Sequence, residues 1–349
     1  MPLRTTLPVL SCAFFSVSEK KLTIKTTDLE QTIVSKTNIT NEENGSVCVL
    51  MSKLTEIVSA LNNEEIKITV NEDLLVEINS NQGTYKITGR STEEFPESTE
   101  TKAKQSLNIK SKDFLRIINK TSFATSKDDL KPALSGVYLN ISSSETTAVA
   151  TDGHRLVKYV QKRKSNQNQS LVIPEKFLKI IKNTITEEEM LVVDIDENSL
   201  STQQGVFTIT TRIIKETFPD FNSVIPDNNT IQATLDSDKL IACLKRVSIF
   251  SNRTTKQTVL SFSDQSVVVS AQDPETSTSG KEHAECEYEG DALTVSYNAK
   301  YLIEVLQNIN TKKVKMYLST PLSAAIIKPE EEKEGEDLTA LLMPLRLNN

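Results

Sequence analysis

The sequence has no tryptophan and is poor in glycine, histidine and cysteine, with nine, two and four of them in 349 residues. Neither GxGxxG nor GxxxxGK[ST] occurs, so no phosphate-cradling loop is expected. The two histidines, His154 and His283, leave little material for a metal site or a proton relay. We therefore expect no cofactor and no bound metal.

The four cysteines stand apart from one another and form no CxxC or Cys/His cluster. They are Cys12, Cys48, Cys243 and Cys286. This spacing supports neither a zinc site nor a disulfide framework, and it favours a reduced cytoplasmic protein. No apolar run reaches the ~18 residues of a membrane helix. The short apolar stretch 7–15 is interrupted by Ser11, and no clear cleavage site follows it, so we expect neither a membrane span nor a secretion signal.

The hairpin-like stretches of the chain follow one design: an alternating apolar run, a polar turn, a second alternating run, and an aspartate after Thr or Gln. They are residues 7–30, 131–154 and 257–275, and they end near Asp28, Asp152 and Asp273. These aspartates lie 124 and 121 residues apart, and Pro96, Pro219 and Pro344 recur after 123 and 125 residues. Two independent markers therefore predict three similar units in a chain whose length fits two or three domains.

Five windows have apolar residues at helical spacing. They are residues 52–61, 113–120, 174–181, 237–247 and 299–309. Ser111 and Asp236 are candidate helix caps, and Pro174 is a candidate first-turn residue. The equivalent leucines of these windows are 61 to 63 residues apart, so each unit holds two similar halves, and a sixth helix would centre before Met1.

Low-complexity joins at residues 98–105 and 227–230 mark the boundaries between the units. We predict an α+β fold with domains at 1–103, 104–226 and 227–349, each with helices against antiparallel sheets and the first domain abbreviated by one helix. The acidic stretch 330–337 is expected to be a solvated loop between two antiparallel strands.

The net charge of −7 is unevenly distributed, because the helical stretches with their flanking residues sum to +5 and the rest of the chain to −12. The ranges summed are 51–62, 112–125, 174–183, 236–250 and 298–310. A basic helix surface on an acidic protein fits sequence-independent contact with nucleic-acid phosphates. The alternative is a set of ordinary solvated helix faces. These helices lack interleaved aromatic residues, which argues against single-strand recognition by stacking, and no helix-turn-helix or zinc-finger spacing is present.

The stretch 150–156, Ala-Thr-Asp-Gly-His-Arg-Leu, has two interpretations. Asp152 and His154 are one residue apart and can be a catalytic pair, whereas Asp-Gly between two apolar runs is a hairpin-turn signal. The aspartate recurs in all three units, which favours a turn residue. Gly153 and His154 occur in the middle unit alone, and this asymmetry indicates a role other than folding.

Three segments together resemble the signatures of the bacterial sliding clamps, the beta subunits of DNA polymerase III. They are residues 150–156, Phe218-Pro219-Asp220 and Met343-Pro344-Leu345-Arg346-Leu347. The resemblance covers nearly the whole chain in order, except that the family's opening strand and helix are absent. It implies three similar domains per chain and a head-to-tail homodimer that closes into a ring around duplex DNA, with sheets outside and helices inside.

The function implied by the resemblance is that of a non-enzymatic processivity factor in the bacterial cytoplasm, associated with the nucleoid. It would tether the DNA polymerase III alpha subunit and other proteins with clamp-binding motifs, after loading by an ATP-driven clamp loader. The rival functions are a non-clamp DNA-binding regulator with a reading helix, and a hydrolase that uses Asp152 and His154.

The resemblance also implies a pocket between the second and third domains for a short motif with a glutamine and two or three large apolar side chains. Its residues would be Leu134, Thr151, Gly153, His154, Arg155, Leu156, Pro219, Val224, Leu341, Met343, Pro344, Leu345, Arg346 and Leu347. For Leu156, Val224 and Leu341, core packing is the alternative. Ser223 and Ala133 replace a basic and an aromatic residue that are common in the family, and these changes bear on the motif preference.

Basic residues near the inner helices are the expected DNA contacts. They are Arg116, Lys120, Lys127, Lys176, Lys179, Lys182, Lys245, Arg246 and Lys256. For the dimer, the resemblance places Ile249 and Phe250 against Leu107 and Ile109 of the other subunit, with an added ion pair from Lys53. Sequence alone assigns these four apolar residues to a core.

Overall fold

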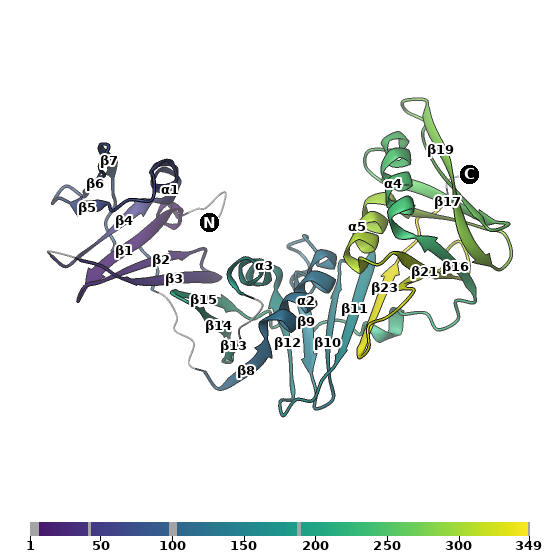
Figure 1. Ribbon diagram of the computed structural model, residues 1–349, viewed down its shortest axis with the longest axis horizontal. Coiled ribbons are helices and arrows are strands. Elements are labelled where there is room, and N and C mark those ends of the chain that lie inside the picture. The colour runs from purple at the N-terminus through teal and green to yellow at the C-terminus, as the bar shows by residue number, and fades with distance from the viewer. Residues whose placement is uncertain (1–6, 41–42, 98–102, 187–189, 348–349) are drawn as a thin grey trace. The chain divides into compact units, whose positions relative to one another are not determined.

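The computed structural model describes residues 7–40, 43–97, 103–186 and 190–347 (Figure 1). The chain divides into two compact units. Unit 1 comprises Met1–Ser111 and Asn183–Ile213, and unit 2 comprises Lys112–Lys182 and Ile214–Asn349. The two units do not follow the repeat boundaries, because strands of the first and second repeats share one sheet in unit 1, and strands of the second and third share another in unit 2.

All five predicted helices are confirmed. They are α1 (Met51–Ala60), α2 (Ser111–Thr121), α3 (Glu175–Thr184), α4 (Ser237–Val247) and α5 (Ala299–Ile309). Asp236 caps α4 as expected, since its side chain accepts a hydrogen bond from the Lys239 N–H. Ser111 does not act as a cap: it is the first residue of α2, and its buried hydroxyl has no hydrogen-bond partner.

Unit 1 is built on an eight-stranded antiparallel sheet and a smaller three-stranded sheet. The large sheet has the order β4 (Gly45–Leu50), β1 (Cys12–Ser18), β2 (Lys21–Thr27), β3 (Gln31–Asn38), β15 (Phe207–Arg212), β14 (Ser199–Gln204), β13 (Met190–Ile195) and β8 (Gln105–Lys110). The small sheet has the order β5 (Lys67–Val70), β6 (Leu75–Asn79) and β7 (Thr84–Thr88). Alternating side chains of β1, β4 and β6 pack with Leu54 of α1 into a core.

Unit 2 is built on a twelve-stranded sheet. Its order is β12 (Gln169–Pro174), β9 (Gly136–Ile141), β10 (Glu145–Thr151), β11 (Arg155–Lys162), β23 (Glu336–Leu342), β22 (Ala325–Pro329), β21 (Lys313–Leu318), β16 (Ile231–Asp236), β19 (Thr278–Glu289), β18 (Ser266–Asp273), β17 (Gln257–Ser263) and β20 (Leu293–Asn298). β11 and β23 lie side by side in antiparallel register, so the second and third repeats share one continuous sheet (Figure 1). The predicted acidic loop joins β22 to β23, although its last two residues belong to β23.

The three repeated aspartates are turn residues, as predicted. The Asp152 Oδ1 atom accepts hydrogen bonds from the His154 and Arg155 N–H groups. Asp28 accepts from two backbone N–H groups in the same way, and Asp273 accepts from one. A carboxylate that satisfies backbone donors stabilises the tight connection between two strands, which explains why each repeat has an aspartate here.

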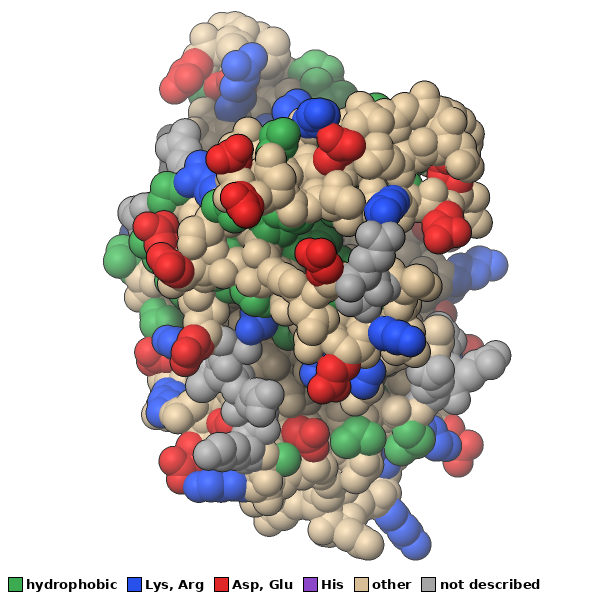
Figure 2. Space-filling view, turned by 90° about the vertical axis from the view of Figure 1, so that its left-hand side faces the viewer, with side chains coloured by type: hydrophobic (Ala, Val, Ile, Leu, Met, Phe, Trp, Pro, Cys, Tyr) green, Lys and Arg blue, Asp and Glu red, His purple; other side chains and the backbone are tan. Residues whose placement is uncertain are grey.

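Figure 2 shows one face of the molecule, at the side of the chain that holds the early strands, with acidic and basic side chains interspersed on its coloured part. Mixed charge of this kind gives a weak local field, in contrast to a single-sign surface.

Candidate functional site

One face of the unit 2 sheet carries an apolar row where the second and third repeats meet. Tyr159 points to the helix side, since its hydroxyl accepts a hydrogen bond from Arg116 of α2. Leu156 and Lys158, which alternate with it along β11, therefore point to the opposite face, here called the outer face. Paired residues across four strands form the row Thr151, Leu156, Leu341 and Ile326, here called the apolar row.

Aromatic side chains extend the apolar row. Leu156 and Leu341 are 2% and 3% exposed, and they form a cluster with Val149 and Ile326. Tyr138 and Phe218 pack against this cluster with their rings stacked 5.3 Å apart, and Phe221 lies beside both rings. Burial alone is equally consistent with core packing, so the accessible residues around the cluster decide what the surface can bind.

The loop and the C-terminal tail beside the row are bonded to each other. Gly153 has φ of +90°, which suits a residue without a Cβ atom. The Met343 N–H donates to the His154 carbonyl at 2.9 Å, so the tail begins against the 152–154 turn. The Met343 side chain stays 43% exposed, and a flexible thioether there can adapt to an apolar ligand.

The tail continues along β20. The Leu345 N–H donates to the Ser296 carbonyl, and the Ser296 hydroxyl donates to the Leu345 carbonyl, both at 2.8 Å. The Gln257 side chain donates to the Arg346 carbonyl. These bonds hold residues almost two hundred positions from His154 beside it, which gathers the predicted tail residues next to the turn.

The remaining predicted pocket residues range from buried to exposed. Thr151 is buried, and its hydroxyl donates to the Arg155 carbonyl. Leu134 and Pro344 are half-buried, whereas Pro219 and Val224 are exposed, as is Leu347 at the end of the described tail. A floor of buried leucines with exposed apolar residues around it is the usual composition of a small peptide or ligand site.

Arg155 lies below this surface, since its side chain is 6% exposed. Its guanidinium bonds to Asp152 at 3.1 Å, to Glu304 of α5 at 2.5 Å and to the Phe123 carbonyl at 2.8 Å. It also stacks between the Phe123 and Tyr301 rings. Every side of the guanidinium is thus occupied by unit 2 itself, and Arg155 joins the 152–154 turn to α5.

Unit 1 repeats the same four-strand arrangement without the apolar chemistry. Its strands β2, β3, β15 and β14 bring together the row Thr27, Thr32, Thr210 and Ser201, in the same register as the apolar row. The Thr32 hydroxyl donates to the Thr27 hydroxyl at 3.0 Å. The backbone is therefore repeated, while three apolar side chains in unit 2 correspond to hydroxyl side chains in unit 1.

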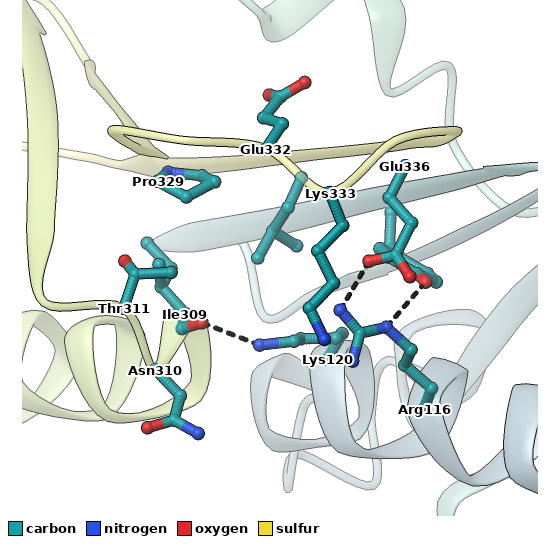
Figure 3. Close-up of a pocket in the computed structure, with 11 residues that line it drawn as sticks. Arg116, Lys120, Ile309, Asn310, Thr311, Pro329, Glu332, Lys333 and Glu336 are labelled. Atoms are coloured by element: carbon teal, nitrogen blue, oxygen red, sulfur yellow. Dashed lines mark hydrogen bonds and ion pairs between the residues drawn. The ribbon is translucent and has the colours of Figure 1, made fainter.

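Two of the predicted DNA contacts lie in a cavity of about 120 Å³ among α2, the end of α5 and the 330–335 loop (Figure 3). Arg116 pairs with Glu336 at 2.5 Å, and the Lys120 ammonium donates to the Asn308 and Ile309 carbonyls at 2.7 Å. Burial, helped by the charges of Arg116 and Lys333, lowers the pKa of Lys120 to about 8. Both cations are thus already bonded within unit 2.

The other predicted DNA contacts lie nearer the surface. Lys127 and Lys179 both pair with Glu175, yet their side chains remain 68% and 65% exposed. Arg246 forms a two-bond pair with Glu282, which raises the pKa of Arg246. The rest of the set consists of Lys176 and Lys182 on α3, Lys245 on α4, and Lys256 before β17.

The predicted dimer residues divide into two groups. Ile249 is 76% exposed and Phe250 is 37% exposed, which leaves apolar surface for a second subunit. Leu107 and Ile109 are each 1% exposed in the core of unit 1, because alternate residues of β8 face its sheet interior. In the single chain these two side chains therefore belong to the core of unit 1, and their contact with a second subunit stays a prediction. Lys53 pairs with Glu56 of its own helix.

The geometry of Asp152 and His154 does not form a catalytic pair. The Asp152 carboxylate binds backbone N–H groups and Arg155, while the His154 ring stacks on Tyr301. All four cysteines are buried free thiols. Among the described residues, no group of acidic, histidine or cysteine side chains has the arrangement of a metal site, and no helix is long and apolar enough to cross a membrane.

Comparisons with known proteins match nearly the whole chain. Models of the N-terminal, central and C-terminal domains of the DNA polymerase III beta subunit match residues 1–99, 108–220 and 222–346. The chain belongs to the DNA polymerase III beta subunit family. Its function is therefore that of a DNA sliding clamp, a non-catalytic processivity factor of that polymerase.

Individual relatives agree with the family. The beta sliding clamp of Pseudomonas putida is 28% identical over 99% of this chain and 94% of the relative, and that of Staphylococcus aureus is 26% identical over 98% and 93%. The crystal structure of the Pseudomonas aeruginosa clamp bound to griselimycin is 26% identical, with a TM-score of 0.87 over 99% of this chain and 94% of that one. The Thermotoga maritima beta subunit, 22% identical with a TM-score of 0.90, covers 100% and 94% and shares the fold.

The sequence patterns do not predict the aromatic part of the cluster. Phe218 directly precedes the repeated Pro219 and belongs to a signature segment, but neither feature indicates which residues it contacts. Tyr138 and Phe221 join it through sheet register and a loop conformation that the alternation pattern does not contain. A search for aromatic residues next to the marker would have found Phe218 and Phe221, whereas Tyr138 needs the structure.

Proposed function

We propose that two copies of this chain close into a ring around duplex DNA in the bacterial cytoplasm, and that the outer face of unit 2 binds linear motifs of the replication proteins that the ring tethers. The polymerase alpha subunit and the clamp loader are the expected owners of such motifs. The observation that carries the peptide site is the apolar row, which is present in only one of two equivalent sheet positions. Exposed Met343 follows its strand β23, and exposed Val224 directly precedes Ile225, which packs against the cluster.

The apolar row of unit 2 differs in chemistry from the hydroxyl row at the same position of unit 1. This difference supports a binding function for the apolar row over a purely structural role. In both units four strands from two repeats pair in the same way. This pairing forms with hydroxyl side chains in unit 1 and with apolar side chains in unit 2, so the fold does not require apolar residues at these positions. An apolar surface bordered by exposed Met and Val favours association with another molecule. The tail bonds from Met343 to His154 and from Leu345 to Ser296 would hold one wall of the site in place for a motif with large apolar side chains.

Two unpaired strand edges support the dimer. β16 pairs with β19 only from Cys286 onward, which leaves residues 278–285 with one open edge among the described strands. β7 is a terminal strand of the small sheet in unit 1. An open edge favours pairing with another chain, and pairing of β19 with β7 of a second copy would satisfy both edges. Ile249 and Phe250 lie beside this part of β19, where Phe250 packs against Gly280.

DNA would be held by weak phosphate contacts from the surface cations. Lys127, Lys179 and Arg246 keep more than half of their side-chain surface exposed. Such contacts are screened by salt and carry no sequence information, which suits a ring that slides. We assign Lys120 instead to the joint between α2 and α5, and Arg116 to the joint between α2 and the sheet, because Lys120 is bonded to the end of α5 and Arg116 to Glu336 of β23 and Tyr159 of β11.

Retention on DNA of different topology tests the ring. The chain is loaded onto nicked circular DNA with an ATP-driven clamp loader, and the circle is then cut once. A ring is retained on the circle and lost from the linear form within minutes, while a groove-binding regulator stays on both. Equal retention before and after cutting would refute the ring.

A further inference from the structure

Lys158 is a cation on the outer face at the border of the apolar row, and Lys328, two residues from Ile326 on β22, lies on the same face. Lys158 is two residues from Leu156 on the same face of β11 and is paired across the sheet with Val149 of the apolar cluster. Its ammonium lies 5.7 Å from the centre of the Phe221 ring and 3.5 Å from the Asn222 Oδ1 atom. The charge is thus held over an aromatic residue that borders the proposed peptide site.

Among the described residues, no carboxylate lies within ion-pair distance of Lys158, whereas the neighbouring Lys328 has two such partners. Lys328, on the same sheet, pairs with Asp337 at 3.0 Å and with Glu332 at 3.6 Å. Asp337 is therefore already engaged, although the nearby charge of Lys158 helps to lower its pKa. Lys158 is a half-buried residue whose ammonium contacts only an aromatic ring and one amide oxygen among the described residues, so the ammonium can still bind a carboxylate.

At the equivalent position in unit 1, the lysine and the valine of the cross-strand pair have exchanged strands. There the cross-strand pair is Lys25 with Val34, and Lys25 lies over the Phe14 ring. Both junctions thus place a lysine over an aromatic ring, but on different strands. In unit 2, but not in unit 1, the lysine lies next to an apolar row. Its charge can therefore affect which peptides bind there.

Resting on the peptide site proposed above, we infer that Lys158 is a specificity-determining residue that favours partner motifs with an acidic side chain close to their apolar anchors. Leu156 and Lys158 are two residues apart, about 6.6 Å along a strand. An extended peptide covers that distance in about two residues. The favoured Asp or Glu would therefore lie about two or three residues from the side chain that contacts Leu156.

A scan of peptide pairs tests this inference. Each pair has a glutamine and two large apolar side chains, with either Glu or Gln at one flanking position, and the position is moved stepwise along the peptide. Binding to the full chain is measured by fluorescence anisotropy. We expect Glu to bind about two- to fivefold tighter than Gln at one position, with an advantage that declines as salt is raised.

The test variant is Lys158→Gln and the matched control is Lys162→Gln. Both remove one positive charge from β11, and Lys162 is four residues farther along the strand. The Glu advantage should vanish in Lys158→Gln and persist in Lys162→Gln. If Glu never binds tighter than Gln, or if its advantage survives in Lys158→Gln, the inference is wrong while the peptide site stands. If no peptide binds the unaltered chain, the peptide site itself is refuted, and the role of Lys158 with it.

Discussion

At the scale of single residues, Arg155 illustrates how a residue of a signature segment can be engaged entirely within the fold. Its position in the 150–156 stretch placed it among the expected pocket residues. Its guanidinium is instead enclosed by Asp152, Glu304 and the Phe123 carbonyl. A buried, fully bonded guanidinium cannot turn to a peptide without leaving two carboxylates unpaired. Arg155 therefore positions the turn that carries His154.

Substitution of Arg155 by Met tests this positioning role. We expect the free energy of unfolding of unit 2 to fall by about 3 kcal/mol, because a buried ion pair loses one partner. Urea denaturation of the full chain measures the loss. Glu304→Gln keeps a hydrogen-bond acceptor and should cost less than half as much. An unchanged denaturation midpoint in Arg155→Met, with peptide binding lost, would instead indicate direct contact with the ligand.

Lys120 predicts a pH dependence of stability. Its pKa is lowered from 10.5 to about 8 in the folded protein by burial. Between pH 8 and 10 the unfolded chain holds this proton and the folded chain does not, so the stability contributed by this group rises with pH. Relative to Lys120→Met, the unaltered protein should gain on the order of 1 to 2 kcal/mol across that range, measured by denaturant titrations at each pH. A constant difference between the two proteins would contradict the lowered pKa.

At the scale of elements, the sequence predicted local structure well because local patterns encode it. The five helices follow from apolar spacing, and the turns at Asp28, Asp152 and Asp273 follow from the chemistry of a carboxylate next to free backbone N–H groups. The pairing of β11 with β23 joins segments about 180 residues apart. No local pattern contains such a pairing, so the apolar row as a row was visible only in the structure.

The same reasoning explains why the surroundings of the cations and of the β8 residues could not be predicted from the sequence. Helical spacing indicates which residues share a face, but not what covers that face. Lys120 is bonded to the end of α5, and the alternation of β8 gave the apolar character of Leu107 and Ile109 without telling whether they face a core or a partner. The resemblance supplied the pocket and dimer residues, and contacts in three dimensions were needed to sort them.

The apolar row gives an element-scale prediction. Leu341→Thr introduces into unit 2 the residue type found at the matching position Thr210 in unit 1. Peptide affinity should fall at least tenfold, because a central apolar anchor of the site is lost. Anisotropy with one labelled peptide measures the change, and Thr210→Val is the matched control, expected to leave affinity unaltered. Equal affinity of both variants would mean that peptides bind elsewhere.

At the scale of the whole molecule, the three repeats are used unequally. One junction of strands is polar and the other apolar, and the open strand edges include those of β7 and of the first half of β19. Equivalent positions of the repeats thus carry different side chains, and in the proposal above one such difference serves peptides while the two edges serve assembly. Differences between equivalent positions are thus the best guide to function in this chain.

Assembly can be tested at Ile249, whose side chain is 76% exposed in the single chain. Ile249→Asp should weaken the dimer at least tenfold, since a charge would be buried in an apolar contact, while the fold of each copy is kept. Sedimentation over a concentration series measures the equilibrium. Met190→Asp, at another exposed apolar residue on β13, is the control. A dimer that survives Ile249→Asp would place the contact elsewhere.

The continuity of the sheet through β11 and β23 means that the proposed peptide site and the seam between two repeats are built from the same strands. A ligand that binds only the folded seam adds its binding free energy to the stability of unit 2, by about 2.7 kcal/mol at a hundred times its dissociation constant. Occupancy of the site is therefore readable as a rise in melting temperature, and a thermal-shift screen of unlabelled peptides or small molecules becomes a direct assay for its ligands.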